Sequence, residues 1–354
     1  MTDQPDGRTD QLAAALRLPD LAVRTLGGSV VWANDEHFAE RENLIRPGPA
    51  SFDPTAFGHK GKVYDGWETR RRREPGHDEA LVRLGVAGIV RAVVVDTSWF
   101  TGNFPPRVSV EGACVDGYPS VPELREASWT TLVSPSAVRG DAQNVFAVPH
   151  EGRLTHVRLR MFPDGGVARL RVHGQVVPDP QLLDGELDLA ALEHGGAVVG
   201  CSDLFYGAPT NLISPGLPRS MADGWETARR RDDGNDWVTV RLAAAGTVRL
   251  AELDTSYYVG NAPGWAGLRG SDCADREPGA DDWFELLART RLQPDTRHRL
   301  RVPASEQVTH VRLDVYPDGG MARLRLWGSL TAAGRERIER HWRDSAPNPR
   351  GDDG

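Results

Sequence analysis

The sequence contains few of the residues that mark secreted, membrane-spanning or nucleic-acid-binding proteins. Only three of its 354 residues are cysteine, and no two lie close together, so neither a disulfide framework nor a cysteine-based metal site is predicted. No apolar run approaches the roughly 18 residues that a membrane-spanning helix needs. Lysine occurs only at Lys60 and Lys62 and the net charge is −8, which argues against a nucleic-acid partner because phosphate binding needs a basic surface. The polar N-terminus lacks a signal-peptide pattern, so we expect a cytoplasmic protein.

What the sequence does contain is a long internal repeat. The segment DGWETRRRR at 65–73 recurs 158 residues later as DGWETARRR at 223–231. Two further segments recur at a similar distance, namely DTSWFTGNFP as DTSYYVGNAP and THVRLRMFPDGG as THVRLDVYPDGG. A steady spacing of this length indicates two whole domains rather than a short stacked repeat unit.

The drift in spacing places the domain boundaries. Repeat one carries about ten extra residues between Asn43 and Asp65, a segment that includes His59 and both lysines. A stretch with two prolines and several acids follows repeat one and is typical of a linker. The predicted division is an N-terminal tail (1–20), repeat one (21–176), a linker (177–190), repeat two (191–330), and a C-terminal helix and tail (331–354).

The hydrophobic pattern predicts mostly β-structure. Residues 155–161 and 167–174 alternate polar and apolar side chains around the turn sequence PDGG, which predicts a β-hairpin. The arginines that alternate with these apolar residues predict a solvated sheet face; they are Arg158, Arg169 and Arg171.

The remaining pattern agrees with an all-β fold. Residues 80–97 predict two further strands, and helical periodicity appears only near the termini, at 9–17 and 331–343. Many short, evenly spaced strands indicate antiparallel packing. We therefore predict two tandem jelly-roll β-sandwich domains with few short helices at the termini.

Several of these segments resemble the allantoicase family. The matching motifs are LIRPG, DGWETRR, PGHD, VDTSWFTGNFP and THVRLRMFPDGG. The resemblance extends from about Leu21 to Gly328. It implies galactose-binding-like jelly rolls and a reaction of purine breakdown, in which allantoate and water give ureidoglycolate and urea. It also implies a small-molecule substrate, allantoate, as the partner.

Allantoate carries a carboxylate and two ureido groups, so its site needs a cation, amide or carboxylate partners, and a proton-transfer group. Within DGWETRRRR, Glu68 is a candidate acid/base. The candidates for holding the substrate here are Asp65, Trp67, Arg70, Arg71 and Arg72. The competing interpretation is structural, because the tryptophan can close the core and Asp65 can cap its own turn.

Two loops supply further candidates. Asp96, Ser98 and Asn103 follow an apolar strand and could hold the ureido N–H groups, although they could equally organise their own loop. Asp35 and His37 are candidate catalytic residues early in repeat one.

His77 completes the catalytic candidates, since a histidine pKa suits proton transfer near neutral pH. When the two repeats are aligned, His77 matches Asn235 and Arg70 matches Ala228, so titratable residues are concentrated in repeat one. The site is therefore expected either in repeat one or between the repeats.

Cofactor use and assembly are less constrained. No paired-ligand spacing demands a metal, so no cofactor is predicted, while a divalent ion at Asp35, His37 or Asp96 stays open. We expect a homo-oligomer. The alternative functions are a non-catalytic tandem carbohydrate-binding protein and a scaffold that has lost activity.

Overall fold

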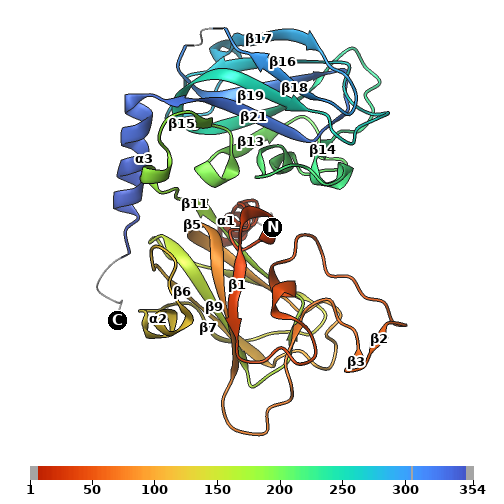
Figure 1. The fold of residues 1–354 in the computed structure, drawn as a ribbon, viewed down its shortest axis with the longest axis vertical. Helices are drawn as coiled ribbons and strands as arrows, with labels where there is room; N and C mark the ends of the chain where they lie inside the picture. The colour runs from red at the N-terminus through yellow and green to blue at the C-terminus, as the bar shows by residue number, and fades with distance from the viewer. Residues whose placement is uncertain (1–6, 304–305, 348–354) are drawn as a thin grey trace, which may run out of the picture. The chain divides into compact units, whose positions relative to one another are not determined.

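The structure is a computed structural model that describes residues 7–303 and 306–347. Residues 1–6 and 348–354, which fall in the predicted tails, lie outside the described residues. The chain separates into two compact units; the second is Pro178–Asp344, and the first ends at Val177 and includes the chain again from Ser345. Each unit is a β-sandwich, which confirms the prediction of two tandem jelly-roll domains with short helices near the termini (Figure 1). None of the helices in the described ranges is long and apolar enough to cross a membrane.

Repeat one is organised by a single 19-residue strand, β5 (Asp78–Asp96). Its first part pairs with β1 and β9 in one layer, and its last part lies between β8 and β11 in the other. The pairing register breaks between Arg83 and Gly88, where the strand passes from one layer to the other. The prediction of two separate strands here was wrong, because one strand serves both layers.

The remaining elements of repeat one are short. The strands are β1 (Ser29–Ala33), β2 (Phe57–Gly58), β3 (Gly61–Lys62), β4 (Trp67–Glu68), β6 (Arg107–Ala113), β7 (Thr130–Ala137), β8 (Gln143–Ala147), β9 (Leu154–Phe162), β10 (Gly166–Val167) and β11 (Arg169–Val176). The helices are α1 (Gly7–Ala15) and α2 (Val121–Glu126), with 3-10 turns η1 (Arg24–Leu26) and η2 (Arg41–Ile45). The first layer has the order β1-β5-β9-β6-β7.

Repeat two has the same plan, with β15 (Asp236–Asp254) in the place of β5. Its other strands are β12 (Leu187–Asp188), β13 (Ala197–Cys201), β14 (Trp225–Glu226), β16 (Trp265–Ser271), β17 (Phe284–Arg291), β18 (Arg297–Arg301), β19 (Val308–Tyr316), β20 (Gly320–Met321) and β21 (Arg323–Leu330). Its helix is α3 (Ala332–Asp344), and its 3-10 turns are η3 (Pro180–Leu182), η4 (Leu192–His194), η5 (Pro209–Ile213), η6 (Met221–Asp223) and η7 (Ala280–Asp282).

The predicted β-hairpin around PDGG is absent. Strand β9 pairs with β5 and β6, whereas β11 pairs with β5 in the other layer, so the two strands are not partners. The turn between them crosses the sandwich and presses against Phe100, where a Cβ on Gly166 would lie 2.0 Å from the phenyl ring. The alternating pattern identified both strands correctly but carries no information about which strand each one joins.

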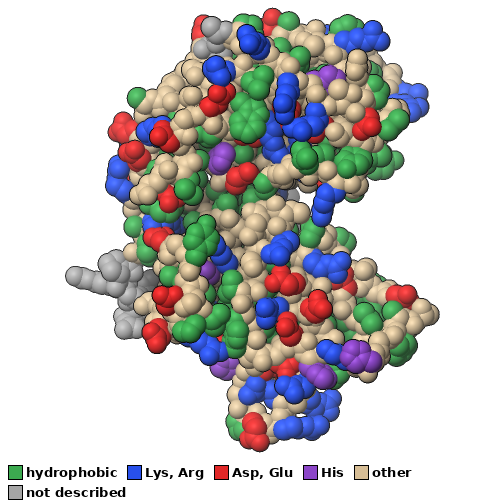
Figure 2. Space-filling view, viewed as in Figure 1, with side chains coloured by type: hydrophobic (Ala, Val, Ile, Leu, Met, Phe, Trp, Pro, Cys, Tyr) green, Lys and Arg blue, Asp and Glu red, His purple; other side chains and the backbone are tan. Residues whose placement is uncertain are grey.

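The alternation also misplaced the arginines. Arg169 is only 2% exposed and Arg158 only 9% exposed, and they lie on different layers, so they do not form one solvated face. Arg169 contacts Asp65, and Arg158 contacts Glu111. Figure 2 shows acidic and basic side chains interspersed on the visible face of each repeat, which agrees with this pairing of opposite charges.

Candidate active site

Strand β4 positions the candidate proton-transfer residue. Its backbone pairs with β10, and the Glu68 N–H and C=O both bond to Ala39. Because side chains alternate along a strand, Trp67 enters the core and Glu68 lies on the opposite side, half-buried. The indole N–H of Trp67 donates to the backbone oxygen of Asp35 over 2.7 Å. Trp67 is fully buried, and it holds the Asp35 segment beside β4.

Glu68 meets Asn103, which comes from the connection between β5 and β6. The Asn103 amide donates to Glu68 Oε1 over 2.7 Å, and Oε2 has no hydrogen-bond partner among the described residues. Burial raises the pKa of Glu68, and the hydrogen bond from Asn103 opposes this only in part. Two separately predicted residues thus meet in the structure. Asn103 binds Oε1 of the Glu68 carboxyl group, and Oε2 is available to a ligand.

Asp35 forms an ion pair with Arg70, which lies two residues after Glu68 in the chain. Arg70 Nε lies 2.6 Å from Asp35 Oδ2, and the Arg70 side chain is 67% exposed. Partial burial would raise the pKa of Asp35, but hydrogen bonds from the His37 N–H and from Arg70 outweigh it and hold that pKa below its usual value. Among the described contacts, only Nε of the Arg70 guanidinium forms a hydrogen bond or ion pair, so Nη1 and Nη2 are available to bind a ligand.

Asp65 is tied to arginines rather than open to a ligand. Its Oδ2 lies 2.7 Å from Arg169 Nη2 and its Oδ1 lies 3.0 Å from Arg46 Nη1. Although partial burial opposes it, these contacts and the Ser51 N–H lower the pKa of Asp65. Asp65 therefore anchors the turn that precedes β4.

Asp96 and Ser98 organise their own loop. Asp96 is 5% exposed, and its Oδ1 accepts hydrogen bonds from the Ser98 N–H at 2.8 Å and the Ser98 hydroxyl at 2.6 Å. This is a local turn that fixes the start of the β5–β6 connection. Its consequence for the site is indirect, because the same connection carries Asn103.

The other two arginines of the motif differ from each other. Arg72 Nη1 lies 2.6 Å from the buried Asp78 carboxylate, and the Arg72 N–H donates to Asp164 over 2.8 Å. Arg71 is exposed and makes no hydrogen bond or ion pair with any described residue. Arg72 thus holds the fold together, and Arg71 is free to meet a ligand.

The two predicted histidines lie in different surroundings. His37 is exposed and lies two residues after Asp35 in the segment beside β4. His77 Nε2 lies 3.4 Å from Glu79 Oε2, and its ring is 5.4 Å from that of Phe162. None of the contacts of His77 involves Glu68 or Asn103.

Repeat two retains part of this arrangement. The Asn261 amide donates to Glu226 Oε1 over 2.6 Å, which matches the contact between Asn103 and Glu68. The Trp225 indole likewise donates to the backbone oxygen of Asp203, over 3.0 Å. Ala228 stands where repeat one has Arg70, so this cation is absent from repeat two, whereas Arg229 is retained at the position of Arg71.

The insertion of repeat one packs on the β5–β6 connection that also carries Asn103, a role that the sequence did not indicate. The Trp99 indole donates to the backbone oxygen of Ala50 over 3.1 Å. The Phe52 ring stacks on Trp99 and on Tyr64, with centroids 5.5 and 5.3 Å apart. The aromatic residues of the insertion could have indicated this role, because a segment rich in aromatic side chains buries them against an apolar surface.

Metal and cavity geometry add two observations. The described residues contain no group of three or more histidine, cysteine, aspartate or glutamate side chains placed to hold a metal ion. A cavity of about 360 Å³ lies in repeat two and includes none of the predicted site residues.

Comparisons with known proteins agree over both repeats. A family model described as Allantoicase repeat matches residues 19–177 and 187–331. A probable allantoicase from Nocardia farcinica is 59% identical over 317 residues, covering 88% of this chain and 94% of that protein. A probable allantoicase from Streptomyces coelicolor is 54% identical over 333 residues, covering 90% of this chain and 87% of that protein. The crystal structure of allantoicase from Saccharomyces cerevisiae matches with a TM-score of 0.77 at 31% identity, covering 92% of this chain and 98% of that one.

Proposed function

This chain belongs to the allantoicase family, and we propose that it hydrolyses allantoate to ureidoglycolate and urea at the Glu68 site of repeat one. The observation that carries this placement is the half-buried Glu68 carboxyl group, held at Oε1 by Asn103 and lying in the same segment as the oriented cation Arg70. A carboxylate substrate that must also exchange a proton requires both kinds of group.

Glu68 is the proton-transfer residue in this proposal. The reaction breaks the bond between the central carbon and one ureido nitrogen and forms a bond from that carbon to the water oxygen. Glu68 Oε2 accepts the proton that water loses and returns it to the departing nitrogen, so that urea leaves neutral. Partial burial assists because it raises the pKa of Glu68 toward the working range of a general base.

Arg70 and Arg71 bind the substrate carboxylate. Asp35 fixes the orientation of Arg70 through Nε, which leaves the two Nη groups in the fork geometry that suits a carboxylate. Arg71 adds a second unpaired cation from the next position. Asn103, which contacts Glu68, and the His37 segment, which pairs with β4 through Phe38 and Ala39, are assigned to the ureido groups.

The repeat comparison favours repeat one over a composite site. Repeat two keeps Glu226 and Asn261, and Arg229 at the position of Arg71, but it has Ala228 in place of Arg70 and lacks the insertion. A carbohydrate-binding function is not favoured, because relatives up to 59% identical are named as allantoicases.

The test is the release of urea from allantoate by the purified protein, with and without prior treatment with a chelator. Release in both samples is the expected result. The absence of urea from folded protein would contradict the proposal, and loss of release only after chelation would require a metal ion that this mechanism does not contain.

A further inference from the structure

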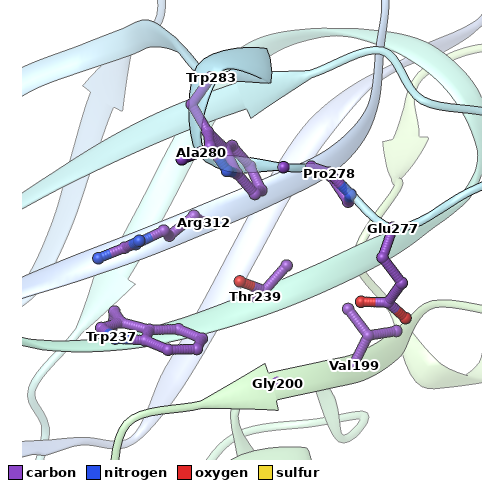
Figure 3. Close-up of a pocket in the computed structure, with 10 residues that line it drawn as sticks. Val199, Gly200, Trp237, Thr239, Glu277, Pro278, Ala280, Trp283 and Arg312 are labelled. Carbon is purple, nitrogen blue, oxygen red and sulfur yellow. The ribbon is translucent and has the colours of Figure 1, made fainter.

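Repeat two contains a cavity of about 360 Å³ on the outer face of its first layer. Trp237 and Thr239 of β15 and Arg312 of β19 form its floor, while Glu277 and Trp283 come from the connection between β16 and β17 (Figure 3). Its volume falls within the usual range for small-molecule sites.

In repeat one a tryptophan and a helix are present at the corresponding place. Trp32 pairs with Leu81 on neighbouring strands, and Arg125 of α2 stacks 4.1 Å from the Trp32 ring. In repeat two, Gly200 pairs with Thr239 at the same register position. The connection from β16 to β17 forms only the 3-10 turn η7 instead of a helix.

Thr239 is polar where repeat one has an apolar residue, and two further lining residues have polar atoms without a described partner. Leu81 of repeat one is fully buried, whereas Thr239 has a hydroxyl with no hydrogen bond among the described residues. Arg312 binds Asp314 through Nε at 2.9 Å and Nη2 at 2.8 Å, which leaves Nη1 unused within the described part of the chain. The Glu277 side chain is exposed at the rim of the cavity and has no described ion pair or hydrogen bond.

The hydrogen-bond donor Arg312 and the acceptor Glu277 lie on different sides of the cavity. In Figure 3, Arg312 and Glu277 lie on either side of Thr239, with the Trp283 indole above them. A ligand that satisfies all three groups needs N–H donors at one edge, a carbonyl oxygen at the other, and a flat face for the indole.

We propose that this cavity of repeat two binds a small planar ureide, a ring or chain containing the N–CO–N group. Its N–H groups donate to Glu277, its carbonyl oxygen accepts from Arg312 Nη1 and the Thr239 hydroxyl, and its plane stacks on Trp283. The assignment rests on the donors and acceptors of the lining and does not depend on where allantoate is hydrolysed.

The test is a titration of the intact protein with hydantoin, a cyclic ureide, followed by the indole N–H signals in nitrogen-15 NMR spectra. The protein has ten tryptophans, and the Trp237→Phe and Trp283→Phe variants identify the two signals that matter. We expect both signals to shift in a saturable way with hydantoin and to stay in place with galactose. Unshifted signals with hydantoin, or equal shifts with galactose, would overturn the proposal.

Two variants locate the ligand contacts. Glu277→Gln should weaken hydantoin binding about tenfold, since a hydrogen bond to a charged group is lost, whereas Glu285→Gln, a surface control outside the cavity lining, should leave it unchanged. Gly200→Trp introduces the tryptophan that repeat one has at the matching position, and it should abolish the shifts. Equal affinity in the wild type and Glu277→Gln would contradict the assigned contacts even if Gly200→Trp failed to fold.

Urea release from allantoate by the Glu277 variant separates this proposal from the function above. We expect release to stay within about twofold of wild type, because Glu277 lies outside the Glu68 site. A wild-type protein that binds hydantoin in the cavity but releases no urea would sustain this inference and refute the function. The reverse result would refute this inference alone.

Discussion

Asn103 donates a hydrogen bond to Glu68 over 2.7 Å and so joins the β5–β6 connection to strand β4. The two residues are 35 positions apart in sequence, and each belongs to a different conspicuous motif. The contact leaves Oε2 of Glu68 as the oxygen that can exchange a proton. The chemistry proposed for the protein depends on this asymmetry.

The first prediction concerns the pH dependence of catalysis. Burial raises the pKa of Glu68 above its usual 4.5, and only the ionised form accepts a proton, so kcat/KM should fall with decreasing pH around a midpoint above 4.5. Asn103→Ala removes the hydrogen bond that lowers this pKa, so its midpoint should lie higher still. Rate profiles of both proteins between about pH 4 and 8 test this. A midpoint at or below 4.5, or one that Asn103→Ala leaves in place, would contradict the role of Glu68.

The second prediction concerns the carboxylate-binding cation. Arg70→Ala should lower kcat/KM by about 10- to 100-fold, mainly through a higher KM, because a charge-assisted contact is lost. Arg73→Ala is the matched control, since Arg73 is exposed and has no described partner. Steady-state kinetics on allantoate would decide between them. Similar losses in both variants would point to a general effect of charge rather than a binding role for Arg70.

The third prediction concerns stability. Arg169 is 2% exposed and contacts both the carboxylate and the backbone oxygen of Asp65. Arg169→Ala should lower the free energy of unfolding by about 2 kcal/mol, because the buried guanidinium loses its hydrogen bonds to the carboxylate and the backbone oxygen of Asp65, while Arg46 keeps its contact with that carboxylate. Arg139→Ala, at an exposed arginine, should change it by less than about 0.5 kcal/mol. Denaturant titrations measure both, and a cost for Arg169→Ala no larger than for the control would refute the buried pair.

The sequence predicted the duplication, the all-β class and the terminal helices because these depend on local periodicity and on sequence motifs that recur. It misassigned the strand partners of β9 and β11, since alternation specifies which faces a strand presents and not which strand lies beside it. Arg169 was interpreted as solvated for a similar reason. Its buried partner, Asp65, is 104 positions away, and no local pattern reports such a contact.

The candidate site was predicted as separate residues rather than as an arrangement. Glu68, Asn103, Asp35 and Arg70 were all named, yet which of them meet depends on the bridge between Ala39 and Glu68 and on the path of the β5–β6 connection. The same geometry separates His77 from Glu68 in its contacts, although only nine positions divide them in sequence.

The fourth prediction concerns the pH dependence of stability. His156 is 1% exposed, and burial together with nearby Arg83 lowers its pKa from 6.5 to about 4. Between these values the unfolded chain binds a proton that the native protein does not, so the free energy of unfolding should decrease as pH falls from 6.5 toward 4. His156→Gln should make this dependence shallower. Unfolding curves at several pH values test it, and an unchanged slope in the variant would contradict the role of His156.

The most direct test of the central claim compares Glu68→Gln with Glu226→Gln. Both substitutions neutralise a glutamate that accepts a hydrogen bond from an asparagine amide, at 2.7 Å in repeat one and 2.6 Å in repeat two. The rate of urea release from allantoate should fall by at least about 100-fold in Glu68→Gln, the usual effect of removing a general base, and stay near wild type in Glu226→Gln. Equal rates in the two variants, or a larger loss in Glu226→Gln, would contradict a catalytic site in repeat one.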